Sequence, residues 1–305
     1  MLEILGKTDV NFMGKRRWAF LFSGIMVVLG IVAVIQIARG SANLGIDFAG
    51  GTAVQLKFDQ AIRVDEARKA LEANSLGDAE LQEFGQENKL LIRLKASTTI
   101  EEKVAERVVA VFTKEFPSNH FVVDSSSEIG PTIGQKLQQD ALIAVIISFA
   151  GIILYVTTRF EFRFGVAAAL ATFHDVLAVL GAFYVLDKEI TLLVVTALLT
   201  LAGYSMTDTV VVFDRIRENL RSRRRESEET IINNAINQVL SRTIVTSLTV
   251  VLVLIPLTLA GGEVLHDFSL ALLWGVIFGT YSSVFVASPL LLLWPGTSGR
   301  LLKRS

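Results

Sequence analysis

Four ionisable residues lie inside long apolar stretches of the sequence, namely Asp208, Arg242, His174 and Asp175. Placing such a group in hydrocarbon costs at least about 2.5 kcal/mol on insertion scales unless it is paired or hydrated. A carboxylate in this position can bind and release a proton, and a nearby cation or imidazole can respond to the change. These four residues therefore predict a proton-coupling site.

Asp208 lies in the stretch GYSMTDT at residues 203–209. Tyr204 and Ser205 precede it by four and three residues, which places them on its face of a helix, and with Thr207 they predict a supporting polar face. At 1.5 Å per residue, Asp208 lies about 9 Å from Asp214 at the end of the apolar stretch. Such a polar stripe is expected to face a bundle interior. The alternative is a structural aspartate that joins two helices.

The other ionisable groups have alternatives of their own. His174 and Asp175 are neighbours whose side chains point about 100° apart on a helix, so they form either part of a proton relay or a structural pair. Arg242 opens an apolar stretch, where an arginine commonly extends toward the membrane surface. It is also placed to pair with Asp208 when the acid is charged and to separate when the acid is protonated, which would make a switch.

The elements that must position these residues are six apolar stretches, each close to the length of about 17 to 25 residues that spans a bilayer. Inside hydrocarbon the backbone must satisfy its own hydrogen bonds, so these stretches are expected to be helices. The predicted fold is a polytopic α-helical membrane protein with six transmembrane helices. The stretches lie near residues 18–38, 141–157, 164–186, 190–213, 244–260 and 268–294.

Basic residues predict the orientation of these helices. Outside residues 39–137 there are 17 Lys and Arg, and with both termini in the cytoplasm only Lys188 falls on the outer side, as the positive-inside rule requires. We therefore expect four parts: residues 1–38 with the cytoplasmic N-terminus and first helix, an extracytoplasmic domain at 39–137, five helices within 138–294, and a cytoplasmic tail at 295–305.

The predicted extracytoplasmic domain shows a β-α-β-β-α-β pattern, which is typical of a small α+β domain of the ferredoxin-like type. Its apolar residues recur with strand or helix spacing. The predicted strands are residues 53–58, 79–84, 89–95 and 121–124, and the predicted helices are 64–73 and 100–116.

Several functional classes are disfavoured. The chain has no cysteine, which removes disulfides, thiolate nucleophiles and cysteine metal sites. It has neither a phosphate-binding loop motif nor a dinucleotide-binding motif. Its formal net charge of −1 is not typical of a protein that binds nucleic acid. We expect that the protein is not an enzyme and that it binds neither a cofactor nor a metal ion. The arginines between Arg215 and Arg225 are explained by topology, although they also suit anionic lipids.

Three segments together resemble the SecF family, the smaller subunits of the SecD–SecF accessory complex of bacterial protein export, within the resistance-nodulation-division superfamily. They are GIDFAGGT at residues 45–52, EIGPTIG at 128–134 and GYSMTDTVVVFDRIREN at 203–219. The pair His174-Asp175 and the triplet SRT at 241–243 also match the family pattern. The resemblance covers nearly the whole chain.

The resemblance implies a multi-pass subunit of the bacterial cytoplasmic (inner) membrane that joins a SecD-like subunit. The pair would use protons driven by the proton-motive force to help pull an unfolded client polypeptide from the SecYEG translocon, after the SecA ATPase has pushed it. Asp208 would be the protonatable carboxylate and Arg242 its basic partner. Two alternatives remain: a proton-driven exporter of small molecules or lipids from the same superfamily, and a scaffold of the translocon that transports nothing.

Overall fold

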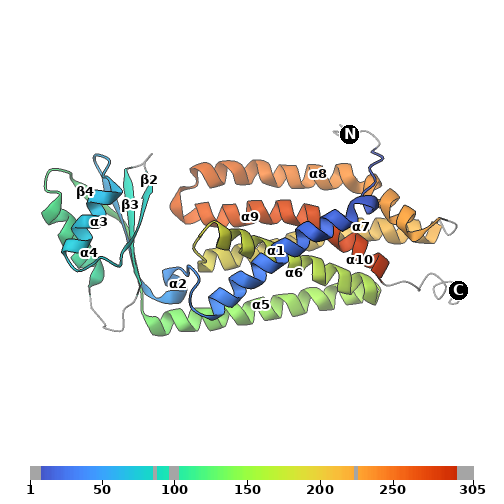
Figure 1. Ribbon diagram of the computed structural model, residues 1–305, viewed down its shortest axis with the longest axis horizontal. Helices are drawn as coiled ribbons and strands as arrows, with labels where there is room; N and C mark the ends of the chain where they lie inside the picture. The colour runs from blue at the N-terminus through green and yellow to red at the C-terminus, as the bar shows by residue number, and fades with distance from the viewer. Residues whose placement is uncertain (1–7, 85–87, 96–102, 223–225, 294–305) are drawn as a thin grey trace. The chain divides into compact units, whose positions relative to one another are not determined.

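The computed structural model describes residues 8–84, 88–95, 103–222 and 226–293 (Figure 1). The chain divides into two compact units. One is Leu44–Leu142, and the other combines Met1–Asn43 with Ile143–Ser305. Each unit has its own apolar core, and each is described separately.

Six helical segments in the described part are long and apolar enough to cross a membrane, which confirms the predicted fold class. After the short turn η1 (Met13–Lys15), they are α1 (Arg16–Ala38), α5 (Pro131–Arg159), α6 (Phe162–Val185), α7 (Leu192–Ser222), α8 (Glu228–Ala260) and α9 (Gly262–Ser282), which continues through η2 (Ser283–Ala287), α10 (Ser288–Leu290) and η3 (Leu291–Leu293).

Three of these helices extend well beyond the apolar stretches that predicted them. The helix α5 begins at Pro131, α7 continues to Ser222, and α8 begins at Glu228. Apolar residues mark only the part of a helix that suits lipid, whereas the ends depend on local chemistry. Proline is favoured at the first helical position, and the Ser227 hydroxyl accepts the Thr230 N–H at 3.2 Å to cap α8.

Small residues bring α1 and α6 into close contact. A Cβ added at Gly30 of α1 would lie 2.2 Å from the carbonyl oxygen of Leu177 on α6, and one added at Gly181 would lie 2.9 Å from the Gly30 nitrogen. Glycines at such interfaces allow helix backbones to approach closely in membranes. The contact holds α1 against the part of α6 that follows Asp175 in the sequence.

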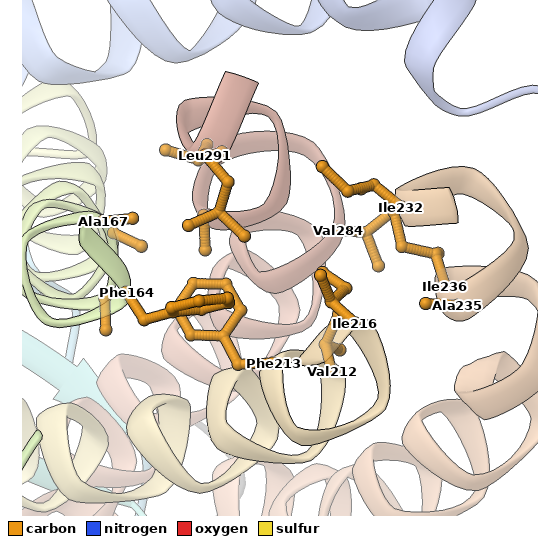
Figure 2. Close-up of a cluster of buried hydrophobic side chains, with 14 of the residues drawn as sticks. Phe164, Ala167, Val212, Phe213, Ile216, Ile232, Ala235, Ile236, Val284 and Leu291 are labelled. Atoms are coloured by element: carbon orange, nitrogen blue, oxygen red, sulfur yellow. The ribbon is translucent and has the colours of Figure 1, made fainter. Parts of the chain in front are cut away.

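An apolar cluster fills one end of the bundle. Figure 2 shows Phe164 of α6, Phe213 of α7 and Leu291 of η3 converging there, with Ile232 of α8 beside them. The rings of Phe164 and Phe213 meet edge to face, with centroids 5.2 Å apart, an arrangement that aromatic pairs favour. We call this group the end cluster. Its buried residues are Phe12, Met13, Val156, Phe160, Phe164, Ala167, Ala168, Ala171, Met206, Val212, Phe213, Ile216, Ile232, Ala235, Ile236, Val284, Val286, Ala287 and Leu291.

The last membrane-spanning segment contains a π-helical turn, η2. Pro289 follows it, and a proline has no N–H for a helical hydrogen bond and its ring clashes with the carbonyl four residues earlier. The wider π-turn accommodates this proline. The Ser288 hydroxyl donates to the Ser283 carbonyl at 2.7 Å, which satisfies a backbone group of the turn.

The unit Leu44–Leu142 contains a four-stranded antiparallel sheet with strand order β2-β3-β1-β4. Two helices pack on the face formed by Val54, Leu56 and Phe58, as the β-α-β-β-α-β pattern predicted. The elements are α2 (Ile46–Ala49), β1 (Gly51–Phe58), α3 (Val64–Ala73), β2 (Glu80–Phe84), β3 (Lys89–Lys95), α4 (Val104–Glu115) and β4 (Phe121–Ile129).

Two elements of this unit differ from the predicted bounds by more than two residues. The helix α4 begins at Val104, and the predicted residues 100–102 fall outside the described part of the chain. The strand β4 continues to Ile129 because its polar run DSSSE pairs with β1 through the backbone, with a register shift between Gln55 and Leu56. Aspartate and, to a lesser degree, glutamate are depleted in strands, so the residue types of this run do not indicate the extension.

Candidate functional site

Asp175 is completely buried in the helix bundle, where three side chains bind it. The Ser205 hydroxyl of α7 and the Ser282 hydroxyl of α9 donate to its Oδ2, the latter at 2.7 Å, and Nδ1 of His174 lies 2.9 Å from its Oδ1. A buried carboxylate is tolerated only when such partners replace its water. Asp175 therefore joins α6, α7 and α9.

His174 is nearly buried, at 5% exposure, and uses only one ring nitrogen. Its Nε2 is buried and has no hydrogen-bond partner within the described residues. The ring stacks on Tyr281, with centroids 6.4 Å apart, and the Tyr281 hydroxyl donates to the Ala19 carbonyl of α1 at 2.8 Å. His174 therefore links Asp175 to α1 through the ring of Tyr281.

Asp208 lies on α7, one turn further along than Ser205, and accepts a hydrogen bond from the Ser283 hydroxyl at 2.7 Å. Arg242 and Thr243 of α8 interact with it electrostatically. Thr243 is buried, and its hydroxyl makes no hydrogen bond of regular geometry among the described residues. Asp208 is thus held from one side by the π-turn and faces α8 on another.

Arg242 does not form an ion pair with Asp208 in this structure. Arg242 is exposed on α8. The ion pairs within 4.0 Å among the described residues do not include Arg242 with Asp208. Its carbonyl accepts the Thr246 hydroxyl at 2.8 Å. The predicted pairing of Asp208 with Arg242 stays a prediction.

The predicted supporting residues separate into two groups. Ser205 is buried and binds Asp175 rather than Asp208. Thr207 is exposed, and its hydroxyl donates to the Gly203 carbonyl of its own helix at 3.1 Å, while Tyr204 is partly exposed. A residue three positions earlier on a helix is displaced by about 60°, which is enough for Ser205 to reach a different neighbouring helix.

Three residues that no sequence motif indicated connect the two acids. Ser282 donates to Asp175 and its neighbour Ser283 donates to Asp208, because successive helical side chains point about 100° apart. Tyr281 contacts His174 from the same turn. The signal was present as the polar run TYSS at residues 280–283 within an apolar stretch.

The arrangement suits the binding and transfer of protons. Two carboxylates, an imidazole and several hydroxyls form a connected polar layer across α6, α7 and α9. Within the described ranges, no group of three or more His, Asp or Glu side chains is placed to hold a metal ion. The carboxylates and hydroxyls of the layer can change their hydrogen bonding together.

Residues 108–297 match the family described as protein export membrane protein SecD/SecF, C-terminal, and residues 43–62 match the SecD/SecF GG motif. The chain belongs to the SecD/SecF family. It is 49% identical to the protein translocase subunit SecF of Thermodesulfovibrio yellowstonii over 306 residues, covering 100% of each chain. The chain is 43% identical to the protein translocase subunit SecF of Magnetococcus marinus, and the match covers 97% of this chain and 96% of that protein.

A solved structure of the SecD/SecF family has the same fold. The crystal structure of SecDF, a translocon-associated membrane protein from Thermus thermophilus, superposes with a TM-score of 0.82 at 35% identity. The match covers 96% of this chain and 39% of that chain. This chain therefore spans well under half of the SecDF polypeptide.

The GG motif of the SecD/SecF family has a steric explanation here. Gly50 and Gly51 have φ of +72° and +138°, values that glycine adopts readily and other residues rarely do. A Cβ at Gly51 would also lie 2.2 Å from the Leu94 carbonyl oxygen. The motif allows the chain to turn from α2 into β1 while β1 pairs closely with β3.

Proposed function

We propose that this accessory subunit of Sec protein export is driven by the proton-motive force through Asp208, with Arg242, His174 and Asp175 as its coupling partners. The proposal places the chain in the bacterial inner membrane with both termini in the cytoplasm. The observation that carries it is the linked pair of carboxylates: adjacent serines on one helix hold Asp175 and Asp208. The sequence offers no nucleotide motif as another energy source.

Protonation of Asp208 gives a simple physical step. The neutral acid loses its attraction to the Arg242 cation, and its hydrogen bond with the Ser283 hydroxyl loses the strength that a charged acceptor gives. The packing of α8 and the π-turn against α7 then changes, which is how a local charge switch biases a larger structure. One charge crossing the membrane supplies about 2.3 kcal/mol per 100 mV.

The partners follow from the family. The SecDF structure supports a SecD partner for this chain, and we propose that the pair assists SecYEG by drawing an unfolded client polypeptide to the outer side. The unit Leu44–Leu142 would meet the client. A pocket lined by Arg159, Arg217 and Arg221 together with Asp214, Glu218 and Ser222 offers arginines to the headgroups of anionic lipids.

The proposal is tested in sealed inside-out vesicles that contain the full chain, its SecD-like partner and the translocon. Export of a reporter protein with ATP present is measured with the proton gradient on and collapsed. We expect Asp208→Asn to abolish the gradient-dependent part of export. Asp214→Asn is the matched control, because Asp214 is six residues further along α7 and is a surface residue paired with Arg159; it should keep the full gradient response.

An equal gradient response from the unaltered chain and Asp208→Asn would contradict the coupling role. The chain would then act as a scaffold of the translocon, and Asp208 would be a structural acid. Loss of export without any gradient in Asp208→Asn would point to misassembly instead, so the amount of assembled complex is measured in each vesicle preparation.

A further inference from the structure

The segment before α1 lies along α8 and is bound there by two asparagines. Nδ2 of Asn237 donates to the Val10 carbonyl at 2.9 Å, and Oδ1 of Asn237 accepts the Val10 N–H at 2.9 Å. Asn233 donates to the same carbonyl at 3.1 Å and accepts the Phe12 N–H at 2.8 Å. We call Asn233 and Asn237 the asparagine clasp.

The clasp recognises backbone rather than side chains. Each amide offers one donor and one acceptor, so Asn237 pairs with both polar groups of Val10 as a neighbouring β-strand would. The spacing of four residues places both asparagines on one face of α8. Arg16 adds an ion pair with Glu229 at 2.7 Å on the same face, although an exposed pair contributes little.

The clasp holds two apolar side chains in the end cluster. Phe12 is 7% exposed and Met13 is 1% exposed, although both precede the first membrane-spanning helix. The Asn11 side chain accepts the Gly14 N–H at 2.8 Å and turns the segment into η1. The segment Thr8–Lys15 therefore forms a stopper at this end of the bundle.

The stopper contacts the turn that carries Ser283. Phe12 packs edge to face on Phe285 of the π-turn, with ring centroids 5.6 Å apart, and Phe285 stacks on Tyr281 at 5.2 Å. Tyr281 in turn stacks on His174. A continuous line of aromatic contacts thus runs from the stopper to the polar layer.

The end cluster also separates Asp208 from water at this end. Val212, one turn after Asp208 on α7, has no exposed surface, and Phe213 and Ile216 beyond it are equally buried. Close-packed apolar interiors of this kind hold no water. Asp208 itself is only partly buried, so the cluster covers the acid on the side of Val212.

We propose that the asparagine clasp seats the segment Thr8–Lys15 as a removable stopper, and that its release opens a water path through the end cluster to Asp208. Phe12 and Phe285 are then positioning residues for the acid, acting through the π-turn. The inference deepens the proposed function by naming what closes the proton site at one end. It supplies the gate that a gradient-driven cycle needs to prevent leakage.

Thiol labelling tests the proposal directly, because the chain has no cysteine of its own. Single cysteines are introduced as Met13→Cys, to report the stopper, and Val212→Cys, to report the path. The full chain with its SecD-like partner is kept in membrane vesicles and treated with a small water-soluble methanethiosulfonate reagent. Each reporter is combined with the double change Asn233→Ala and Asn237→Ala, or with Asn234→Ala.

Asn234 is the matched control, since it is an asparagine of the same helix whose side chain binds Glu226 instead of the stopper. We expect both reporters to react about tenfold faster or more in the clasp variant, the change that roughly one lost hydrogen bond produces in an opening equilibrium. Both should stay protected with Asn234→Ala. Phe12→Ala, which leaves the clasp intact, should expose Val212→Cys alone.

Two results would overturn the proposal. If Met13→Cys stays protected in the clasp variant, the asparagines do not hold the stopper. If Met13→Cys reacts while Val212→Cys stays protected in the clasp variant and in Phe12→Ala, the stopper does not guard the path. Labelling needs no export activity, so a negative export result with Asp208→Asn leaves this test unaffected. A control cysteine in a separate apolar cluster, Val194→Cys on α7, should stay protected in every variant that is folded.

Discussion

At the scale of single residues, hydroxyl groups determine how the two buried acids are held. Ser205, Ser282 and Ser283 are small enough to fit between packed helices, and each donates to a carboxylate. Hydrogen bonds to charged groups contribute about 1.5 to 3 kcal/mol, and the loss of one leaves a buried acceptor short of a donor. The stability of the bundle and the chemistry of its acids therefore depend on the same serines.

Ser205→Ala is expected to destabilise the bundle, because it removes a donor from the buried Asp175. Thr207→Ala is the matched control, since the Thr207 hydroxyl is exposed and bonds only to its own helix. We expect a loss of about 1 to 3 kcal/mol for Ser205→Ala and less than about 0.5 kcal/mol for Thr207→Ala. Thermal unfolding in detergent measures both; equal unfolding temperatures would show that Ser205 does not support Asp175.

Sequence reasoning found the acids but not all their partners. Asp208, Asp175 and His174 were visible because ionisable groups are rare in apolar stretches. Ser282 and Ser283 were not, because serine is common in membrane helices and only the three-dimensional packing of α9 shows which acid each one meets. Spacing on one helix also assigned Ser205 to the wrong neighbour, since the closest acid lies on α6.

At the scale of helices, close backbone contact ties α1 to α6. The Gly30 and Gly181 positions leave no space for a side chain between the two helices. The apolar pattern predicted that both helices exist, but it could not predict which helices pair, because most apolar residues of α1 are exposed. The apolar pattern also could not predict where the helices end, since caps and prolines determine the ends.

Gly30→Ala is expected to destabilise the pairing of α1 with α6. The new methyl group would lie 2.2 Å from the Leu177 carbonyl oxygen, and such overpacking costs about 1 to 3 kcal/mol. Gly24→Ala is the control on the same helix, because nothing lies within 4 Å of its added Cβ. Its unfolding temperature should stay the same or rise slightly, as alanine favours helix. A fall for both variants, or for neither, would contradict the role of this contact.

At the scale of the whole molecule, the chain combines two units with separate cores. The sheet unit Leu44–Leu142 buries Phe112, Leu56 and Phe58 against one another without help from the bundle. The β-α-β-β-α-β pattern predicted the elements of this sheet, and right-handed crossovers leave few arrangements for them. The length of β4 did not, since backbone pairing carries it through polar residues.

The segment Leu44–Leu142 is expected to fold by itself as a soluble fragment with a single cooperative unfolding transition. Phe112→Ala should lower its stability by about 3 to 5 kcal/mol, because it empties the centre of the core. Val122→Ala, at a side chain that is 62% exposed, should change it by less than about 0.5 kcal/mol. Circular dichroism with increasing urea measures all three; a gradual transition in the unaltered fragment would show that it needs the bundle.

The π-turn gives the last spanning helix a fixed unit of rotation. It contains one residue more than an α-helical turn, so its conversion to regular helix would rotate one half of the helix against the other by about 100°. The same angle separates Ser282 from Ser283. A rotation by this angle could turn Ser282 to the direction in which Ser283 points now. Each serine would then lose its hydrogen bond to its acid in the same movement.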